Sequence, residues 1–476
     1  MPCPPKKKLS KKGYWLFIKK KNNGFLLLAF LILILAIFLP TPQGLTDNGK
    51  VMIGIFLMAA ILWSTESLPL AVTGLLVMAI QSLLHIVKYR EVFSAFGNEA
   101  VFFLIGAFMI AAAVEKHGFH RRIAFNFLKI FEKNPKIFTF GLMICCAFLS
   151  FIIPEHAVAA LFLPIGLMIL TGMKLLPGKS NFGKVCMLSI AYGCSIGSLG
   201  TLIGGARNPL TVGILENHGI SVSFFDWMVY AMPVVFISLP VVWLILQIFF
   251  PIEVNDLSNA KKEIALQLNK IGKMGVKEIT TILILCFTMF LWIFFSQDIG
   301  VAIIAIAGAI LLFVTKTISW KDIEQRLPWG IILLYGGAIT LGLGMEQTGA
   351  ARWIADGVLN ALGENPYIII LGLIILSKYL TEMMSNTGAV AMLLPIGIGL
   401  ASEIENVSIL LASMIIALSS GLAFMLIIAT PGNAITYTSG YFSTRDLARA
   451  GLIANVACIV IIWLIAIGYW KGILGL

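Results

Sequence analysis

Apolar runs long enough to cross a bilayer recur along the whole chain, and they constrain the fold more than any other feature. A helix crosses the hydrocarbon core with about 20 apolar residues. Such runs lie near 25–40, 50–64, 69–87, 101–116, 184–203, 226–251, 279–296, 299–317, 329–346, 408–428 and 452–470. They carry no amphipathic pattern of matching length, which argues against a large soluble protein. The sequence therefore predicts an all-α polytopic membrane protein.

The net charge of +11 does not indicate a nucleic-acid partner, because the basic residues gather at the ends of the apolar runs. Cytoplasmic loops of membrane proteins carry this excess of lysine and arginine. The lysine-rich segment 1–24 is therefore expected to be a cytoplasmic tail. We expect a multi-pass protein of the cell (inner or plasma) membrane with its C-terminus outside. The scattered cysteines suggest neither a disulfide framework nor a metal site.

Two longer apolar segments, 137–172 and 366–401, are each interrupted by a polar tip. The tips are Pro154-Glu155-His156 and Ser385-Asn386-Thr387, and each leads into Leu-Pro-Ile-Gly. Half of such a segment, about 17 residues at 1.5 Å each, is short for a full crossing. Each segment is therefore predicted to be a re-entrant hairpin of two half-helices.

The two segments belong to an internal duplication with a spacing of 231 positions (337 − 106). The same spacing pairs Gly106 with Gly337, Glu115 with Glu346, Gly118 with Gly349, Arg121 with Arg352, and Ala124 with Ala355. Five predicted spans separate the hairpins, and an odd number turns the second hairpin upside down. The sequence thus predicts an inverted repeat, which is typical of transporters.

Each hairpin is followed by a span rich in glycine, proline and small polar residues, over 195–209 and 419–433. We expect these spans to unwind in mid-membrane and to face the hairpin tips, although kinked packing helices are the alternative. The predicted organisation is a tail (1–24), scaffold and connecting helices (25–135 and 226–365), two transport segments (136–225 and 366–448) and a final helix (449–476).

These motifs together resemble the divalent anion/sodium symporter family over essentially the whole chain. Ser385-Asn386-Thr387 is similar to its Ser-Asn-Thr signature, and Trp63 to Pro69 to its Trp-x-Thr-Glu-x-Leu-Pro segment. The segments 200–208 and 429–433 are similar to its two unwound stretches. The resemblance implies a homodimer that works by an elevator movement. It also implies a Na⁺ site at Thr381, Ser385, Asn386 and Ala423, and substrate contacts from Asn386, Thr387, Thr430 and Pro431.

The first half departs from the family pattern. Glu155 and His156 stand where the family has asparagine and threonine, and Arg207 precedes Asn208 where proline is usual. Three readings remain open for these residues. In the first, Glu155 and Arg207 form an ion pair that replaces a first sodium. In the second, Glu155 or His156 carries a coupling proton. In the third, Arg207 binds the substrate anion directly. Glu155, His156, Arg207 and Asn208 are all candidate substrate contacts.

The function expected from these features is secondary active transport of a small anion, such as a di- or tricarboxylate or sulfate. A sodium-independent exchanger, a proton-coupled carrier, an arsenite-permease relative and an anion channel are the alternatives. A membrane enzyme is not expected, because adjacent Glu155 and His156 point about 100° apart on a helix and no second ligand cluster accompanies them. No organic cofactor is expected.

Overall fold

The computed structural model describes residues 11–363 and 365–476, with side chains from residue 23 onward. Within these ranges the chain is helical, with no strand. Eight helices are long and apolar enough to cross a membrane, and shorter apolar helices accompany them. The prediction of an all-α polytopic protein is confirmed. Part of the predicted tail, residues 1–10, lies outside the described residues, and α1 (Lys11–Phe38) begins within the rest of it.

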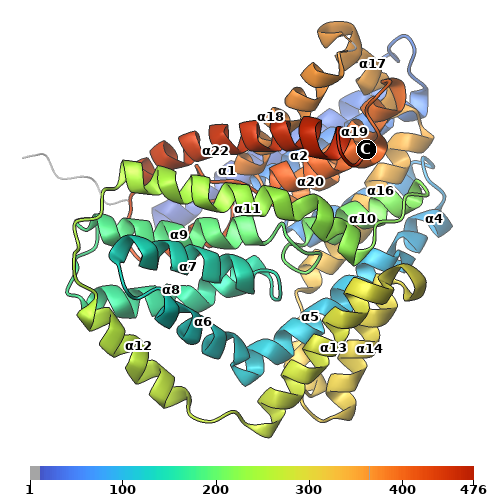
Figure 1. Cartoon of the computed structure of the whole chain (residues 1–476). Helices are drawn as coiled ribbons and strands as arrows, with labels where there is room; N and C mark the ends of the chain where they lie inside the picture. The colour runs from blue at the N-terminus through green and yellow to red at the C-terminus, as the bar shows by residue number, and fades with distance from the viewer. Residues whose placement is uncertain (1–10, 364) are drawn as a thin grey trace, which may run out of the picture.

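After α1, and besides one 3-10 turn (Ala95–Gly97), ten α-helices follow in the described part of the first half (Figure 1). They are α2 (Asp47–Thr65), α3 (Leu70–Leu83), α4 (Tyr89–Ser94), α5 (Glu99–His117), α6 (Phe119–Ile130), α7 (Pro135–Leu149), α8 (Glu155–Gly172), α9 (Asn181–Gly197), α10 (Arg207–Asn217) and α11 (Phe224–Phe249). A basic amphipathic helix, α12 (Ser258–Ile271), packs on α6 and α8 and leads to the second half.

The second half repeats this order. Its helices are α13 (Val276–Ile299), α14 (Val301–Val314), α15 (Trp320–Glu324), α16 (Trp329–Gln347), α17 (Ala350–Leu362), α18 (Pro366–Met383), α19 (Asn386–Glu403), α20 (Ile409–Ser420), α21 (Pro431–Tyr437) and α22 (Thr444–Ile465). A π-helical turn, Ala466–Lys471, extends α22. Helices α3 and α14, and likewise α8 and α19, have bounds that differ by the predicted 231 positions (301 − 70 and 386 − 155).

The duplication also shows in how the helices begin. Asn134 and Asn365 each accept a backbone hydrogen bond as the N-cap of a hairpin arm, and a proline follows each of them. Proline suits this position because its missing N–H would have no partner there. Gly118 and Gly349, with φ of +75° and +73°, make the two turns after α5 and α16. The duplication is therefore present in local geometry as well as in sequence.

At the contact between the two halves, each half packs one of its helices against a helix of the other half. Helix α3 packs on α16 of the other half, and α14 packs on α5. Small residues allow both crossings: a Cβ at Gly337 would meet Gly74 Cα at 2.3 Å, and a Cβ at Gly106 would meet the Ala305 carbonyl carbon at 2.6 Å. Gly74 and Ala305 are equivalent positions, as are Gly106 and Gly337. This reciprocal contact is what a two-fold relation between the halves produces.

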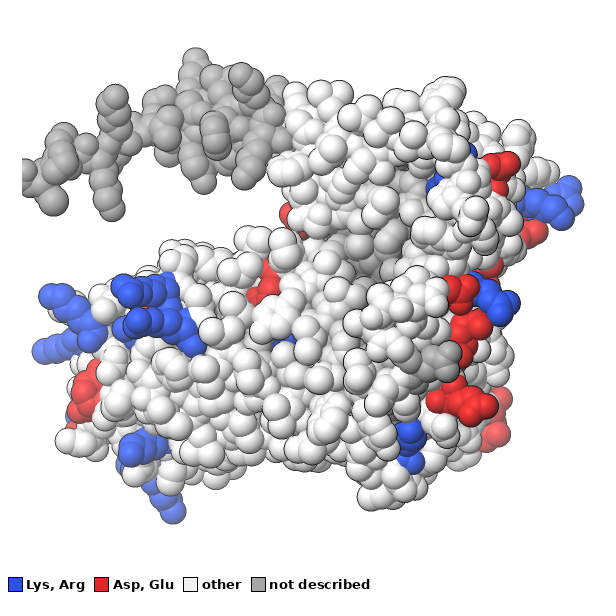
Figure 2. Space-filling model, turned by 90° about the horizontal axis from the view of Figure 1, so that it is seen from above, with Lys and Arg blue, Asp and Glu red and all other residues white. Residues whose placement is uncertain are grey.

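Charged side chains gather at opposite ends of the molecule. Figure 2 shows a large group of lysine and arginine side chains at one end, most of the acidic side chains together with some basic ones at the other, and a belt with few charged atoms between them. Such a belt matches the surface that a membrane-embedded protein presents to lipid, because charge is costly in hydrocarbon.

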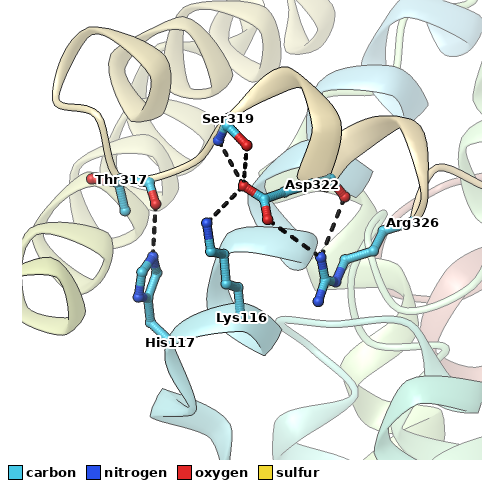
Figure 3. Close-up of polar contacts among 6 residues, drawn as sticks. All are labelled: Lys116, His117, Thr317, Ser319, Asp322 and Arg326. Atoms are coloured by element: carbon cyan, nitrogen blue, oxygen red, sulfur yellow. Dashed lines mark hydrogen bonds and ion pairs between the residues drawn. The ribbon is translucent and has the colours of Figure 1, made fainter.

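A polar cluster joins the end of α5 to the segment before α16 (Figure 3). Asp322 accepts from Lys116 Nζ at 2.6 Å, and His117 Nε2 lies 2.8 Å from the Thr317 carbonyl oxygen. Ser319 and Asp322 form a capping box at the start of α15. These hydrogen bonds hold the pKa of Asp322 well below its usual range, with the largest contribution from Lys116. The cluster thus fastens the two halves of the chain together at one end.

Candidate functional site

Both predicted hairpins are present as helix pairs with a break at the predicted tip. The first pair is α7 and α8 with the break at 150–154, and the second is α18 and α19 with the break at Met384-Ser385. Both predicted unwound stretches are also present, as 198–206 between α9 and α10 and 421–430 between α20 and α21. Helices α8 and α18 have 18 residues each and qualify by length to cross a membrane. The sequence analysis expected each arm to be too short for a full crossing. The observed lengths do not support that expectation, so the hairpin arms are identified by the breaks at their tips.

The two tips and the two breaks meet around one cavity of about 340 Å³. The tips contribute Pro154, Glu155, His156, Ser385, Asn386 and Thr387. The breaks and the helices that follow them contribute Gly204, Gly205, Ala206, Arg207, Ile428, Ala429 and Pro431. The remaining wall is Glu66, Leu70, Phe108, Ile331 and Leu334. Residues that lie far apart in sequence thus converge as predicted.

Several helices begin at this cavity. Helices α8, α10 and α19 start at Glu155, Arg207 and Asn386, and α3 and α21 start at Leu70 and Pro431, all of which line it. The free N–H groups and the dipole at a helix N-terminus favour negative charge. The Arg207 side chain, 1% exposed, adds a full positive charge. This end of the cavity is suited to a small anion.

A cluster of oxygen atoms lies beside the second tip. Thr381 Oγ1 donates to the Ser420 carbonyl at 2.7 Å. The amide group of Asn386 places one terminal atom 2.7 Å from Thr381 Oγ1, 3.2 Å from the Ser420 carbonyl oxygen and 3.3 Å from the Ala429 carbonyl oxygen. All three neighbours are acceptors. If the amide nitrogen faces these three atoms, it donates hydrogen bonds to them. If the amide oxygen faces them, the four oxygen atoms form a ligand set suited to a hard cation.

Glu382, one residue after Thr381, fixes the second break and was missed by the sequence argument. Its carboxylate is 3% exposed. Oε1 accepts from Phe424 N at 2.7 Å and from Asn455 Nδ2 at 2.7 Å, and Oε2 accepts from Leu426 N at 2.9 Å. Met425 N contacts both oxygens. An acidic residue inside an apolar helix beside the signature was a signal that could have revealed it.

An asparagine pins each break in the same way. Asn208 Nδ2 donates to the Ser198 and Thr201 carbonyls at 2.8 and 2.7 Å. Asn433 Nδ2 donates to the Ala423 and Leu426 carbonyls at 3.2 and 3.0 Å. Each asparagine thus bridges two carbonyl groups that lie three residues apart. Asn208, a predicted substrate contact, does not line the cavity.

Three predicted contacts of the second half, Thr430, Ala423 and Ser385, form local hydrogen bonds here. Thr430 Oγ1 accepts from Asn433 N at 3.1 Å as the N-cap of α21, and the cavity wall beside it is formed by Ala429 and Pro431. The Ala423 carbonyl faces Asn433, whereas the carbonyls of Ser420 and Ala429 face Asn386. Ser385 Oγ caps α19 by accepting from Gly388 N at 3.2 Å, and Thr387 is half-buried in the wall.

Glu155 and Arg207 line the same cavity but make no direct ion pair within 4.0 Å among the described residues. Arg207 Nη2 instead donates to Ser198 Oγ at 2.7 Å. A Cβ at Gly421 would lie 2.3 Å from Nη2, so the guanidinium packs against the second break. The guanidinium is bonded to Ser198, and buried Glu155 Oε2 has no hydrogen-bond partner among the described residues, so the Glu155–Arg207 ion pair stays a prediction. His156 is exposed in the cavity wall.

The chain resembles known transporters in both sequence and fold. It is 30% identical over 492 residues to the sodium-dependent dicarboxylate transporter SdcS of Staphylococcus saprophyticus, covering 96% of this chain and 94% of that protein. The transporter of the same name from Staphylococcus aureus strain USA300 is 30% identical over 503 residues, covering 98% and 96%.

Solved structures share the fold at low identity. MtrF of Neisseria gonorrhoeae, described with a class of antimetabolite efflux pumps, aligns with a TM-score of 0.56 at 12% identity over 95% of this chain and 94% of its own. The YdaH transporter of Alcanivorax borkumensis aligns with a TM-score of 0.55 at 12% identity, over 89% and 98%. The model of the sodium:sulfate symporter transmembrane region matches residues 19–476. The chain therefore belongs to the sodium:sulfate symporter family, a family of membrane transporters and not of enzymes.

Proposed function

We propose that this protein is a secondary active transporter that moves a small divalent anion, preferably a dicarboxylate, together with Na⁺. The observation that carries the proposal is the meeting of both hairpin tips and both breaks at one cavity, beside which the oxygens of Thr381, Ser420 and Ala429 surround the Asn386 amide group. The relatives named as sodium-dependent dicarboxylate transporters support the same pairing of ion and substrate.

The substrate is held by neutral donors and by positive charge. Asn386 and Thr387 on one side, and the start of α10 with Arg207 on the other, bracket the cavity. An arginine fork suits carboxylate and sulfate geometry alike. Because Arg207 is already packed against Ser198 and Gly421, it acts mainly as a fixed charge. Sulfate is the competing substrate.

The Na⁺ is held at the second half. Thr381 Oγ1, Asn386 Oδ1 and the carbonyls of Ser420 and Ala429 supply its ligands when the Asn386 amide oxygen faces inward. Sodium bound there lies beside the substrate cavity and stabilises the anion electrostatically. Glu382 holds the backbone of the second break in place and so presents these carbonyls.

The first half uses Arg207 in place of a second sodium. Its guanidinium is buried between the first break and Gly421 of the second, so one positive charge is permanently present. One Na⁺ then suffices for each dianion. A proton on Glu155 or His156 is the alternative, since Glu155 Oε2 is buried and unpartnered.

Transport follows an elevator movement of the hairpins and broken helices against a scaffold. Helices α7–α10 and α18–α21 pack on one another, and α3, α5, α14 and α16 pack on one another and meet the first group at α10 and α19. Helices α11 and α22 pack on each other and on α9 and α18, which groups them with the moving part. Both tips lie inside the molecule at one cavity, which supports re-entrant hairpins inserted from opposite sides. We place the basic end in the cytoplasm and expect a homodimer in the bilayer.

Purified protein in liposomes tests the function. Labelled succinate should accumulate inside when Na⁺ is present outside, and unlabelled sulfate should compete. Uptake that needs only a pH gradient would establish proton coupling, and uptake that needs only internal anion would establish exchange. Equilibration without accumulation under every gradient would show a channel and overturn the proposal.

A further inference from the structure

The C-terminal end of α10 borders a second cavity that shares no residue with the candidate site. It measures about 830 Å³ and lies between α10 and α19 on one side and α16 and α17 on the other. Two ion pairs cross from side to side. His218 Nε2 lies 3.2 Å from Glu346 Oε2, and Arg352 Nε lies 3.0 Å from Glu403 Oε1. Each pair joins a proposed transport element to a proposed scaffold element.

The two pairs differ in what keeps them attractive. His218 Nδ1 lies 2.9 Å from the Ile214 carbonyl oxygen, which can only accept, so Nδ1 carries a hydrogen. A neutral imidazole protonated at Nδ1 presents a lone pair at Nε2. That lone pair would face the Glu346 carboxylate, which is 59% exposed. The contact is therefore attractive only when the ring carries its second proton. An arginine side chain stays charged throughout the physiological pH range, so the attraction between Arg352 and Glu403 does not depend on pH in the same way.

The charged groups around His218 come from several helices. Glu216 on α10 is a neighbour of Glu99 on α5. Glu99 Oε1 accepts from Ala302 N at 2.9 Å, and Glu91 on α4 accepts from Gln347 Nε2 at 2.9 Å. Arg352 and Glu403 face the same cavity as His218 and Glu346. Among these described groups, Glu346 alone forms an ion pair with His218. The last turn of α10 docks on the scaffold through the His218–Glu346 pair and through Glu216 beside Glu99, and Asn98 Nδ2 donates to the Gly213 carbonyl one turn earlier at 2.9 Å. The His218 contact is the ion pair that joins α10 to α16, and it depends on a proton.

We propose that His218 and Glu346 form a proton-operated latch between the moving part and the scaffold. Protonation of the imidazole stabilises the conformation described here, and loss of the proton weakens the docking of α10 on α16, while the Asn98–Gly213 hydrogen bond remains. The inference rests on the proposed movement of α10 relative to α16. Because the contact is attractive only when the ring carries its second proton, the latch responds to the pH at its own face of the membrane. Because the pair is partly exposed, we expect a shift of a few-fold rather than a complete switch.

Amide hydrogen exchange on the full-length protein in lipid nanodiscs tests the latch without any substrate. After correction for intrinsic exchange, α10 and the end of α16 should be roughly threefold better protected at about pH 6 than at about pH 8. His218→Gln should remove this difference, and Glu346→Gln should do the same. Arg352→Gln should lower protection equally at both pH values, and His117→Gln, with its ring on Thr317, should keep the wild-type response.

The outcomes separate the two proposals. If His218→Gln and Glu346→Gln retain the wild-type pH difference, the latch is refuted whatever the uptake assay shows. If the difference vanishes in both variants while the wild-type protein takes up no anion, the latch stands and the transport proposal fails. A wild-type protein without any pH difference in α10 also refutes the latch.

Discussion

Asn455 Nδ2 donates to Glu382 Oε1 at 2.7 Å and so ties α22 to the last turn of α18. The same carboxylate accepts from three successive backbone N–H groups of the second break. Four donors thus converge on one buried anion and stabilise it, and no lysine or arginine in the described part of the chain forms a hydrogen bond with it.

Glu382→Gln should therefore destabilise the protein by about 3 kcal/mol, because an amide presents a donor to N–H groups that need an acceptor. The loss should appear as a lower Tm in detergent and as uptake reduced even at low temperature. Glu405→Gln, at an exposed carboxyl, is the matched control and should change neither. Equal stability of the two variants would show that the break is held by other contacts.

Thr381→Val should raise the Na⁺ concentration needed for half-maximal uptake by at least about tenfold, since it removes one oxygen ligand at constant shape. Thr381→Ser should restore most of the affinity. Thr436→Val removes a hydroxyl that bonds within its own helix, to the Gly432 carbonyl at 2.8 Å, and should leave the Na⁺ dependence unchanged. A wild-type Na⁺ dependence in Thr381→Val would exclude this oxygen cluster as the ion site.

Asn386→Ala should abolish uptake while the protein still folds, because the residue lies at both the ion cluster and the substrate cavity. Size-exclusion behaviour and Tm provide the check on folding. Full activity in this variant would remove the second hairpin from the site.

Arg207→Gln should reduce uptake by more than about tenfold by removing the fixed charge from the cavity, and Glu155→Gln should reduce it less. If the two groups are coupled through the shared cavity, the double variant will be milder than the product of the single effects. Arg121→Gln, at an exposed arginine of α6, is the control. Strictly multiplicative effects would show that Glu155 and Arg207 act independently.

The cluster around Asp322 should make stability depend on pH. Its pKa is lowered in the folded protein by Lys116 and Ser319, so the carboxylate stabilises the fold above its unfolded pKa of about 3.9. That contribution is lost as the pH falls through the lower folded value. The Asp322→Asn variant should accordingly have a lower Tm than the wild-type protein at neutral pH, and this difference in Tm should disappear in acid. A deficit that stays constant with pH would indicate lost packing instead.

The membrane class, the duplication, both hairpins and both breaks were predictable, because apolar length, polar tips and a fixed spacing are properties of the sequence alone. Arg207 was recognised as a departure from the family pattern. Its hydrogen-bond partner Ser198 was not predicted, because the two side chains meet only when the first break folds back. Glu382 was missed because its backbone donors lie about 40 residues away, in a stretch without regular structure, and its side-chain donor Asn455 lies still further along the chain in α22. Residues whose partners come from the other half, such as Gly74 with Gly337, were equally invisible.

The crossing of α3 with α16 and of α5 with α14 makes neither half self-sufficient. During synthesis the first half must wait in the bilayer, its glycine-lined faces in contact with lipid, until helices more than 200 residues later are made. Such distant pairing slows assembly and exposes the unfinished chain to wrong partners. The two halves, made as separate chains, should consequently recover the native state only when they are produced together in the same membrane.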